Sequence, residues 1–212
     1  MTEFIYLHGF ASGPNSNKAS AFKKRFEELK IPIQIPDLQE NDFKNLTLSR
    51  QIKLIQSILD NNNKEKYGII GSSMGGYLAC LAAQARNSVK AMYLMAPGFN
   101  FLNRWKNKLK LSNNTESLIS VYHYGYNKEV LLNTNLFRDA ETWQTLPLNK
   151  VIPTKIVHGL HDDTVDIQES RNFVASHPWC HLTEVDSDHG LLSTIDWIIE
   201  DSLNFFKKQK LI

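Results

Sequence analysis

A serine between two glycines is the feature of this sequence that points most directly to chemistry. Residues 71–75 read GSSMG, which places Ser73 in a G-x-S-x-G pattern. The residues before it predict a strand (67–71), and small apolar residues after it predict a buried helix (74–85). Such a turn presents a serine hydroxyl at a helix N-terminus, where free N–H groups stabilise negative charge. We therefore predict that Ser73 is a nucleophile, since the neighbouring Ser72 lacks the glycine spacing.

A serine hydroxyl needs a base, and the base needs an acid that orients it. His189 follows the last predicted strand (181–186), and the turn after strand 155–158 contains Asp162 and Asp163. In a parallel sheet the loops after these strands lie at the edge where the nucleophile strand ends. The order Ser, Asp, His is a known order for this chemistry. We predict His189 as the base and either Asp162 or Asp163 as the acid.

The negative charge that develops on a carbonyl oxygen requires two N–H donors. We predict the amide of Met74, which follows the nucleophile, and the amide of Phe10, which follows the first predicted strand (4–8). This chemistry requires no cofactor. His158 and His161 lie three residues apart on a turn without a matching second pair, so the sequence predicts no metal site.

Strand and helix patterns alternate along the chain, which predicts an α/β fold with a mostly parallel sheet of about six strands flanked by helices. Several strands are apolar at consecutive positions, as expected for strands buried on both faces. Asp166 followed by Glu169 resembles a capping box at a helix start. The predicted strands are 4–8, 32–36, 67–71, 91–95, 155–158 and 181–186, and the predicted helices are 18–29, 48–59, 74–85, 166–176 and 191–206.

The alternation is interrupted between residues 99 and about 150. This stretch is too long for a plain connection, so we interpret it as an insertion that covers the site or, alternatively, merely decorates the fold. Its aromatic residues can line an acyl pocket or form a small core of the insertion, and the second interpretation is favoured. These aromatic residues are Trp105, Tyr122, Tyr124, Tyr126, Phe137 and Trp143.

The composition is that of one globular domain. Among 212 residues, 42% are hydrophobic and 22% charged, with 24 basic and 22 acidic residues and a formal net charge of +2. This balance argues against disorder and against nucleic-acid binding through bulk positive charge. No apolar run is long enough to span a membrane, and no leader pattern is present. With only Cys80 and Cys180, no disulfide framework is expected, which favours the cytoplasm.

These motifs resemble the α/β-hydrolase superfamily and, more narrowly, the small bacterial YqiA/YcfP-like esterases. The resemblance rests on residues 6–14, the turn at Ser73, residues 158–162 and the Asp-His pair at 188–189. It implies Asp162 rather than Asp163 as the acid, six strands rather than eight, and a lid. The expected organisation is a single domain, with a core of residues 1–98 and 151–212 and a cap of about residues 99–150.

The function expected from these residues is hydrolysis of a small-molecule carboxylic ester or thioester through an acyl-enzyme on Ser73. A peptidase or a carbon–carbon hydrolase with the same three residues is an alternative. A catalytically silent binding or scaffold protein on the same fold is a second alternative, because the fold does not fix the function. The sequence leaves the oligomeric state open.

Overall fold

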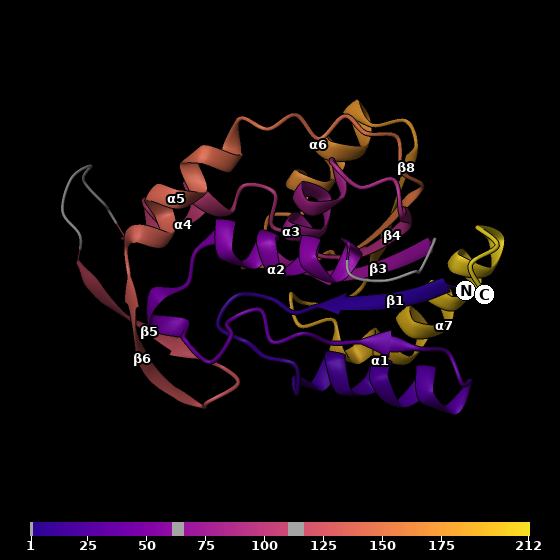
Figure 1. The fold of residues 1–212 in the computed structure, drawn as a ribbon, viewed down its shortest axis with the longest axis horizontal. Coiled ribbons are helices and arrows are strands. Elements are labelled where there is room, and N and C mark those ends of the chain that lie inside the picture. Colours follow the sequence, from indigo (N-terminus) through magenta and orange to yellow (C-terminus); the bar gives the residue numbers. More distant parts are fainter. Residues whose placement is uncertain (1, 61–65, 110–116) are drawn as a thin grey trace.

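The computed structural model describes residues 2–60, 66–109 and 117–212. Six strands form one sheet in the order β2-β1-β3-β4-β7-β8, and every neighbouring pair is parallel. This confirms the predicted α/β fold (Figure 1). The strands are β1 (Thr2–Leu7), β2 (Ile33–Gln34), β3 (Lys66–Ser72), β4 (Val89–Met95), β7 (Thr154–Gly159) and β8 (Cys180–Val185).

Helices cover both faces of this sheet (Figure 1). On one face lie α1 (Asn17–Glu28) and α7 (Ile195–Lys208), and on the other lie α2 (Leu48–Asp60), α3 (Met74–Ala83) and α6 (Gln168–Ser176). Two short 3-10 turns are η1 (Phe43–Asn45) and η2 (Leu192–Thr194). Within the described ranges, no helix has the length and apolarity of a membrane-spanning segment.

Alternating residues of each strand supply the two cores. Phe4 and Tyr6 of β1 pack in the core beneath α1 and α7, whereas Ile5 and Leu7 pack in the core beneath α2 and α3. This alternation follows from the two-residue period of a strand. Because both faces are covered, consecutive positions are apolar, as the sequence predicted for buried parallel strands.

The predicted helix 191–206 begins four residues later than expected. Leu191 has a φ of 55°, in the left-handed region, which a right-handed helix does not contain. The chain therefore passes through η2 before α7 begins at Ile195. The buried Leu191 side chain nevertheless belongs to the core beneath α7, which accounts for its apolar character.

The start of α6 also differs from the capping box that the sequence suggested. The helix begins at Gln168, whose N–H donates to the Asp166 carboxylate at 2.8 Å. Glu169 does not complete the box, because its carboxylate accepts the N–H of Asn100 at 2.7 Å and pairs with Arg104. Both partners come from the chain after β4, so local spacing could not reveal them.

Between β4 and β7 the chain leaves the sheet. We call residues 99–150 the inserted segment, of which residues 110–116 lie outside the described residues. Its elements are α4 (Phe101–Leu109), β5 (Leu118–His123), β6 (Lys128–Asn133) and α5 (Asn135–Gln144), and β5 and β6 pair as an antiparallel hairpin. The hairpin lies at the end of the sheet toward which the arrow of β1 points (Figure 1).

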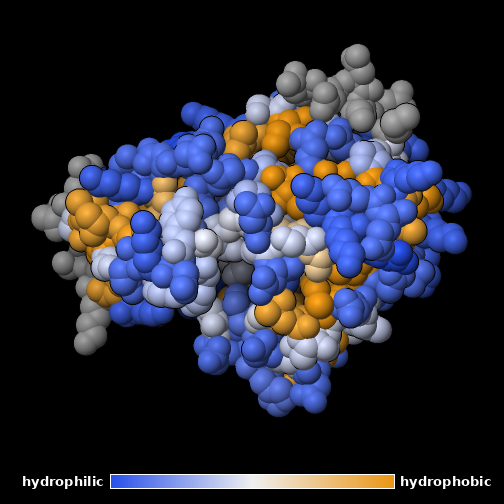
Figure 2. Space-filling view, turned by 90° about the horizontal axis from the view of Figure 1, so that it is seen from below, coloured by the Kyte–Doolittle hydropathy of each residue, from blue (hydrophilic) through white to orange (hydrophobic). Residues whose placement is uncertain are grey.

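The aromatic residues of the inserted segment fall into two groups. Phe137 is buried against Phe101 and Trp105, with ring centroids 6.3 and 6.1 Å away. By contrast, side chains of the hairpin are exposed, including Tyr122 (41%), Tyr124 (75%) and Tyr126 (48%). The prediction that all these aromatics form a core is therefore wrong for the three tyrosines. Figure 2 shows apolar side chains at this end of the molecule, and the exposed apolar residues of the hairpin include Leu118 and Leu131.

Candidate active site

Ser73 occupies the sharp turn between β3 and α3. Its backbone has a φ of 53° and a ψ of −120°, a strained conformation for a residue with a side chain. The flanking glycines are required by close packing. A Cβ on Gly71 would lie 2.7 Å from the carbonyl oxygen of Gly75, and a Cβ on Gly75 would collide with the carbonyl oxygen of Leu7. The predicted turn is therefore built by backbone contacts that leave no room for side chains beside the serine.

The structure brings Ser73, His189 and Asp162 together. The Oγ of Ser73 lies 3.1 Å from Nε2 of His189, and Nδ1 of His189 lies 2.7 Å from Oδ2 of Asp162. A proton on Nδ1 satisfies Asp162 and leaves Nε2 as an acceptor for the serine hydroxyl. Ser73 follows β3, Asp162 follows β7 and His189 follows β8, so the carboxyl ends of three strands converge on this point.

Asp162 is the acid that reaches the histidine, whereas Asp163 is exposed. The side chain of Asp162 is fully buried. Its other oxygen, Oδ1, accepts the N–H groups of Val165 at 2.7 Å and Thr164 at 2.9 Å. Burial alone would raise the pKa of Asp162, but hydrogen bonds from His158, His189 and the Val165 amide hold that pKa well below its ordinary value. The carboxylate therefore stays ionised at neutral pH.

His158 is a second partner of Asp162 that the sequence reasoning missed. Its ring is fully buried, and Nε2 lies 3.1 Å from Oδ2 of Asp162 and 2.9 Å from the carbonyl oxygen of Val165. Both neighbours are acceptors, so Nε2 carries a proton that they share. Nδ1 lies 2.7 Å from the hydroxyl of Ser170. The four-residue spacing between a strand-end histidine and the acid was the available signal.

The two predicted N–H donors come from segments that lie next to the serine. Met74 is the first residue of α3, so its N–H has no acceptor within the helix. Phe10 belongs to the loop of residues 9–13 after β1, which we call the β1 loop. This loop runs beside the serine, since a Cβ added to Gly9 would lie 3.3 Å from Cβ of Ser73.

His8 supports the β1 loop from beneath. Its ring is 2% exposed, and Nε2 accepts the N–H of Leu38 at 3.1 Å. Nδ1 therefore carries the proton and donates to the carbonyl oxygen of Gly9 at 3.0 Å. Burial lowers the pKa of His8, which keeps the ring neutral. The structure thus gives His8 a supporting contact, and the sequence had assigned it no catalytic role.

Lys18 is a further neighbour of the site that the sequence did not single out. Its Nζ donates to the backbone carbonyl of His189 at 3.4 Å. Burial lowers the pKa of Lys18 to about 8, although the charges of Asp162 and Asp188 oppose this shift. A lysine in the first turn of α1 had no local signal, because its partners lie in the loops after β7 and β8.

Metal-ligating side chains do not gather elsewhere in the described ranges, where no group of three or more His, Cys, Asp or Glu residues could hold an ion. His161 pairs with Asp186 at 2.7 Å on the surface, away from His158. Cys80 is buried in the core, as predicted, and burial raises the pKa of its thiol. A thiol in that state is a poor nucleophile.

The parallel sheet, its strand order and the helices on both of its faces define the α/β-hydrolase fold. The chain superposes on Est1E from Butyrivibrio proteoclasticus, solved with ferulic acid, with a TM-score of 0.85 and 20% identity, covering 100% of this chain and 90% of that chain. It also superposes on α/β hydrolase domain-containing protein 10 from mouse, with a TM-score of 0.79 and 22% identity, covering 97% and 90% of the two chains.

The chain belongs to the family described as "Uncharacterised protein family (UPF0227)", which matches residues 3–207. This confirms the resemblance to the YqiA/YcfP-like family that the motifs suggested. A further relative is the Mycoplasma pneumoniae protein named "Putative esterase/lipase 2", which is 33% identical over 104 residues. That match spans 44% of this chain and 37% of the relative's length.

Proposed function

We propose that this protein is a serine hydrolase that cleaves a small-molecule carboxylic ester or thioester through an acyl-enzyme on Ser73. The observation that carries the proposal is the continuous line of hydrogen bonds from Ser73 through His189 to the buried carboxylate of Asp162. The position of Ser73 at the N-terminus of α3 supports it, because that end of a helix stabilises an oxyanion.

In the acylation step, Oγ of Ser73 attacks the carbonyl carbon while Nε2 of His189 takes the hydroxyl proton. The amides of Phe10 and Met74 bind the oxygen that becomes negative. The imidazolium of His189 then gives its proton to the departing alcohol or thiol, and the acyl group remains on Oγ. Asp162 stabilises the imidazolium and keeps the ring in the required tautomer, without itself taking the proton.

In the deacylation step, His189 takes a proton from a water molecule, which attacks the acyl carbonyl carbon. The second tetrahedral intermediate uses the same two amides. It collapses as the imidazolium of His189 returns its proton to Oγ of Ser73, which releases the carboxylic acid and restores the free serine and the neutral histidine. The low pKa of Asp162 keeps its charge in place throughout the cycle at neutral pH. The reaction needs no cofactor.

We also propose that the inserted segment is a cap, with residues 1–98 and 151–212 as the core of a single domain. Its position beyond the carboxyl ends of the strands supports this division (Figure 1). The name of the Mycoplasma relative, which includes esterase and lipase, favours an ester over an amide. A near-neutral net charge of +2 favours selection by pocket shape rather than by a strong electrostatic field.

The test is a chain-length series of nitrophenyl esters and acyl thioesters, together with labelling by a fluorophosphonate. We expect turnover of at least one series, and labelling at Ser73. Ser73→Ala should abolish labelling and lower turnover by about 10³-fold or more. Ser72→Ala is the matched control, because the neighbouring hydroxyl lacks the contact with His189.

Three results would overturn the proposal or its substrate class. Ester hydrolysis that survives Ser73→Ala would place the chemistry elsewhere. A folded wild-type protein that shows neither labelling nor turnover would favour a silent scaffold. Turnover of peptides or of carbon–carbon bonds, with esters and thioesters left intact, would also reject the proposed substrate class.

A further inference from the structure

Two successive carbonyl groups of the β1 loop are held by parts of the chain that are distant in sequence. The carbonyl oxygen of Ala11 accepts the N–H of Tyr124, in the turn between β5 and β6, at 2.8 Å. The carbonyl oxygen of Ser12 accepts a hydrogen bond from Nε2 of Gln39. Ala11 itself has a φ of 51°, an unfavourable conformation for alanine. The loop that carries Phe10 therefore depends on outside contacts for its shape.

Gln39 connects this loop to a buried histidine of the inserted segment. His123, at the end of β5, is 0% exposed, and its Nε2 lies 2.7 Å from Oε1 of Gln39. Its other nitrogen, Nδ1, accepts the N–H of Tyr126 at 3.2 Å. These partners fix a neutral ring with the proton on Nε2. The amide of Gln39 then has one orientation, with its oxygen toward His123 and its NH₂ toward Ser12.

The ring of His123 has little freedom to move. It stacks on the ring of Tyr126 at a centroid distance of 3.8 Å, and it meets the ring of Phe43 edge-on at 4.8 Å. Burial lowers the pKa of His123, although a backbone hydrogen bond and the charge of Asp37 oppose this shift. The neutral state that the hydrogen bonds require is therefore also the state that the surroundings favour.

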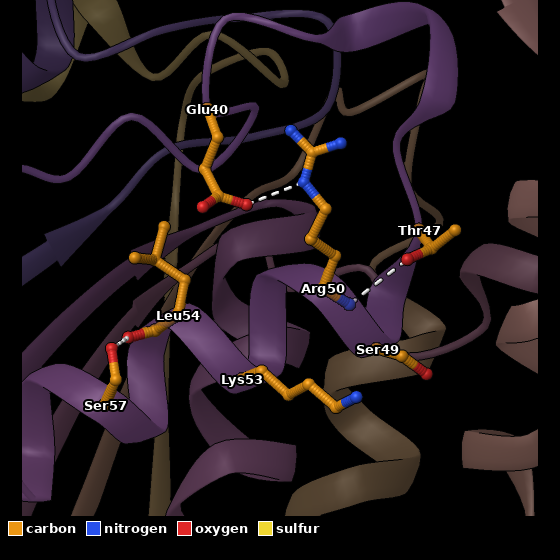
Figure 3. Close-up of a pocket in the computed structure, with 7 residues that line it drawn as sticks. All are labelled: Glu40, Thr47, Ser49, Arg50, Lys53, Leu54 and Ser57. Carbon is orange, nitrogen blue, oxygen red and sulfur yellow. Dashed lines mark hydrogen bonds and ion pairs between the residues drawn. The ribbon is translucent and has the colours of Figure 1, made fainter.

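The backbone of Gln39 is held from the surface side by Arg50 of α2. Nη2 of Arg50 donates to the backbone carbonyl of Gln39 at 2.6 Å, and Nε of Arg50 donates to the Glu40 carboxylate at 2.6 Å. Figure 3 shows Arg50 reaching Glu40 from α2, with its own N–H bonded to Thr47, along a surface groove of about 420 Å³. The side chain of Gln39 points away from solvent, with 3% exposed.

The side chain of Phe10 is anchored in the same direction. Its ring contacts Phe43 at 5.5 Å, Phe101 at 5.6 Å and Trp105 at 4.9 Å, and the last two belong to α4 of the inserted segment. The ring anchors residue 10, while the bonds to Ala11 and Ser12 restrict rotation of the peptide groups that follow. Together with the hydrogen bond from His8 to the Gly9 carbonyl, which shares a peptide group with the Phe10 N–H, these contacts restrict the direction of that N–H.

We propose that His123 and Gln39 are positioning residues that hold the β1 loop so that the Phe10 N–H faces the developing oxyanion at Ser73. This inference rests on the function proposed above. It makes the inserted hairpin part of the reaction machinery as well as a cover. Two hydrogen-bonded routes connect the hairpin to the β1 loop. One runs from His123 through the side chain of Gln39 to the carbonyl of Ser12, and the other is the bond from the Tyr124 N–H to the carbonyl of Ala11.

The test compares two conservative variants with a control that loosens the inserted segment elsewhere. Gln39→Met keeps the length of the side chain and removes both hydrogen bonds. His123→Phe keeps a ring that stacks on Tyr126 and removes the bond to Gln39. The control is Ser49→Ala, which removes a bond of 2.8 Å from Trp143 of α5 to α2, on a different side of the segment.

We expect kcat to fall about 10- to 100-fold in Gln39→Met, with KM changed less than about twofold, because a misdirected donor weakens the transition state and leaves the ground state intact. His123→Phe should show a smaller loss of the same kind. The rate of fluorophosphonate labelling, which also builds charge on an oxygen at this place, should fall in parallel. Ser49→Ala should keep the wild-type kcat.

The inference is overturned if a folded Gln39→Met or His123→Phe variant retains wild-type kcat and labelling rate. It is also overturned if Ser49→Ala, at equal loss of stability, loses as much kcat as the two variants. Should Gln39→Met fail to fold, His123→Phe decides the question. Failure of the proposed function is a separate result, because it would appear as a wild-type protein without Ser73-dependent turnover.

Discussion

The parallel sheet and the inserted segment hold functional groups in different ways. In the sheet, Ser73, Asp162 and His189 each follow a strand end, so the strand order is enough to bring them together. In the inserted segment, His123 reaches the β1 loop through a single side chain that is 84 residues away in sequence. Topology thus brings together the three residues to which we assign the reaction, whereas we propose that polar contacts between distant segments position the β1 loop beside them. The two contributions can be broken separately.

The largest expected effect lies at the strained turn of the sheet. Ser73→Gly removes the proposed nucleophile, so turnover should fall about 10³-fold or more. The same change relieves the backbone strain at a φ of 53°, and we expect the free energy of unfolding to rise by about 1 kcal/mol. Ester turnover and urea unfolding of the same protein sample measure both effects.

Ser73→Ala is the matched variant for that prediction. It should lose the same activity without the gain in stability, because alanine bears the same left-handed strain. Equal unfolding free energies for the glycine and alanine variants would show that the turn stores no strain.

The next largest effect concerns the packing that holds the turn. Gly75→Ala would place a Cβ against the carbonyl oxygen of Leu7, which belongs to β1 and cannot move without distorting the sheet. We expect a loss of about 3 kcal/mol or more in the free energy of unfolding. Gly13→Ala is the control, because the nearest atom to its Cβ would be Nε2 of Gln39 at 3.9 Å. A wild-type urea midpoint for Gly75→Ala would contradict this account.

The features that could be predicted from sequence are those with local causes. The turn at Ser73 has a fixed glycine spacing, and each buried parallel strand has its own apolar run. The positions of Asp162 and His189 follow from strand ends in a parallel sheet. Helix ends were less predictable. At Leu191, for example, a single residue in the left-handed region delays the start of α7.

The features that escaped prediction depend on where side chains meet after folding. Lys18 carries no local pattern that distinguishes a partner of the site from an ordinary helix residue, and the only local signal at His158 is its four-residue spacing from Asp162. The contact between Gln39 and His123 joins a loop and a hairpin that pack together only in the tertiary structure. Exposed and buried side chains alternate along 118–123 and place His123 on the inner face of β5, but the sequence LISVYH does not show this alternation as a polar–apolar pattern.

Lys18 allows a prediction on pH dependence. The folded chain releases the Lys18 proton near pH 8, whereas the ordinary value is 10.5, so the unfolded chain binds more protons between these pH values. Wild-type stability should therefore rise with pH across this window. Lys18→Met lacks the buried charge, and we expect it to be about 1–2 kcal/mol more stable than the wild type at pH 7. This advantage should shrink toward zero as the pH approaches 10.5.

Urea unfolding of both proteins at pH 7, 8.5 and 10 measures this difference. Lys23→Met is the control on the same helix, because it removes a lysine that is 60% exposed. A stability difference between Lys18→Met and the wild type that stays constant across the three pH values would be incompatible with a buried charge.

The smallest expected effect lies in the inserted segment, at the place where α5 meets α2. Ser49→Ala leaves the Nε1–H of Trp143 without its acceptor, and we expect a loss of about 1 kcal/mol in the free energy of unfolding. A second hydrogen bond between α2 and α5, from the Ser49 N–H to the Asp139 carboxylate at 2.8 Å, involves the backbone of residue 49 and is not removed by the substitution. The segment should therefore stay docked, and kcat should remain at its wild-type value. A fall in kcat would mean that the whole segment, rather than the bridge through Gln39, holds the site in its working geometry.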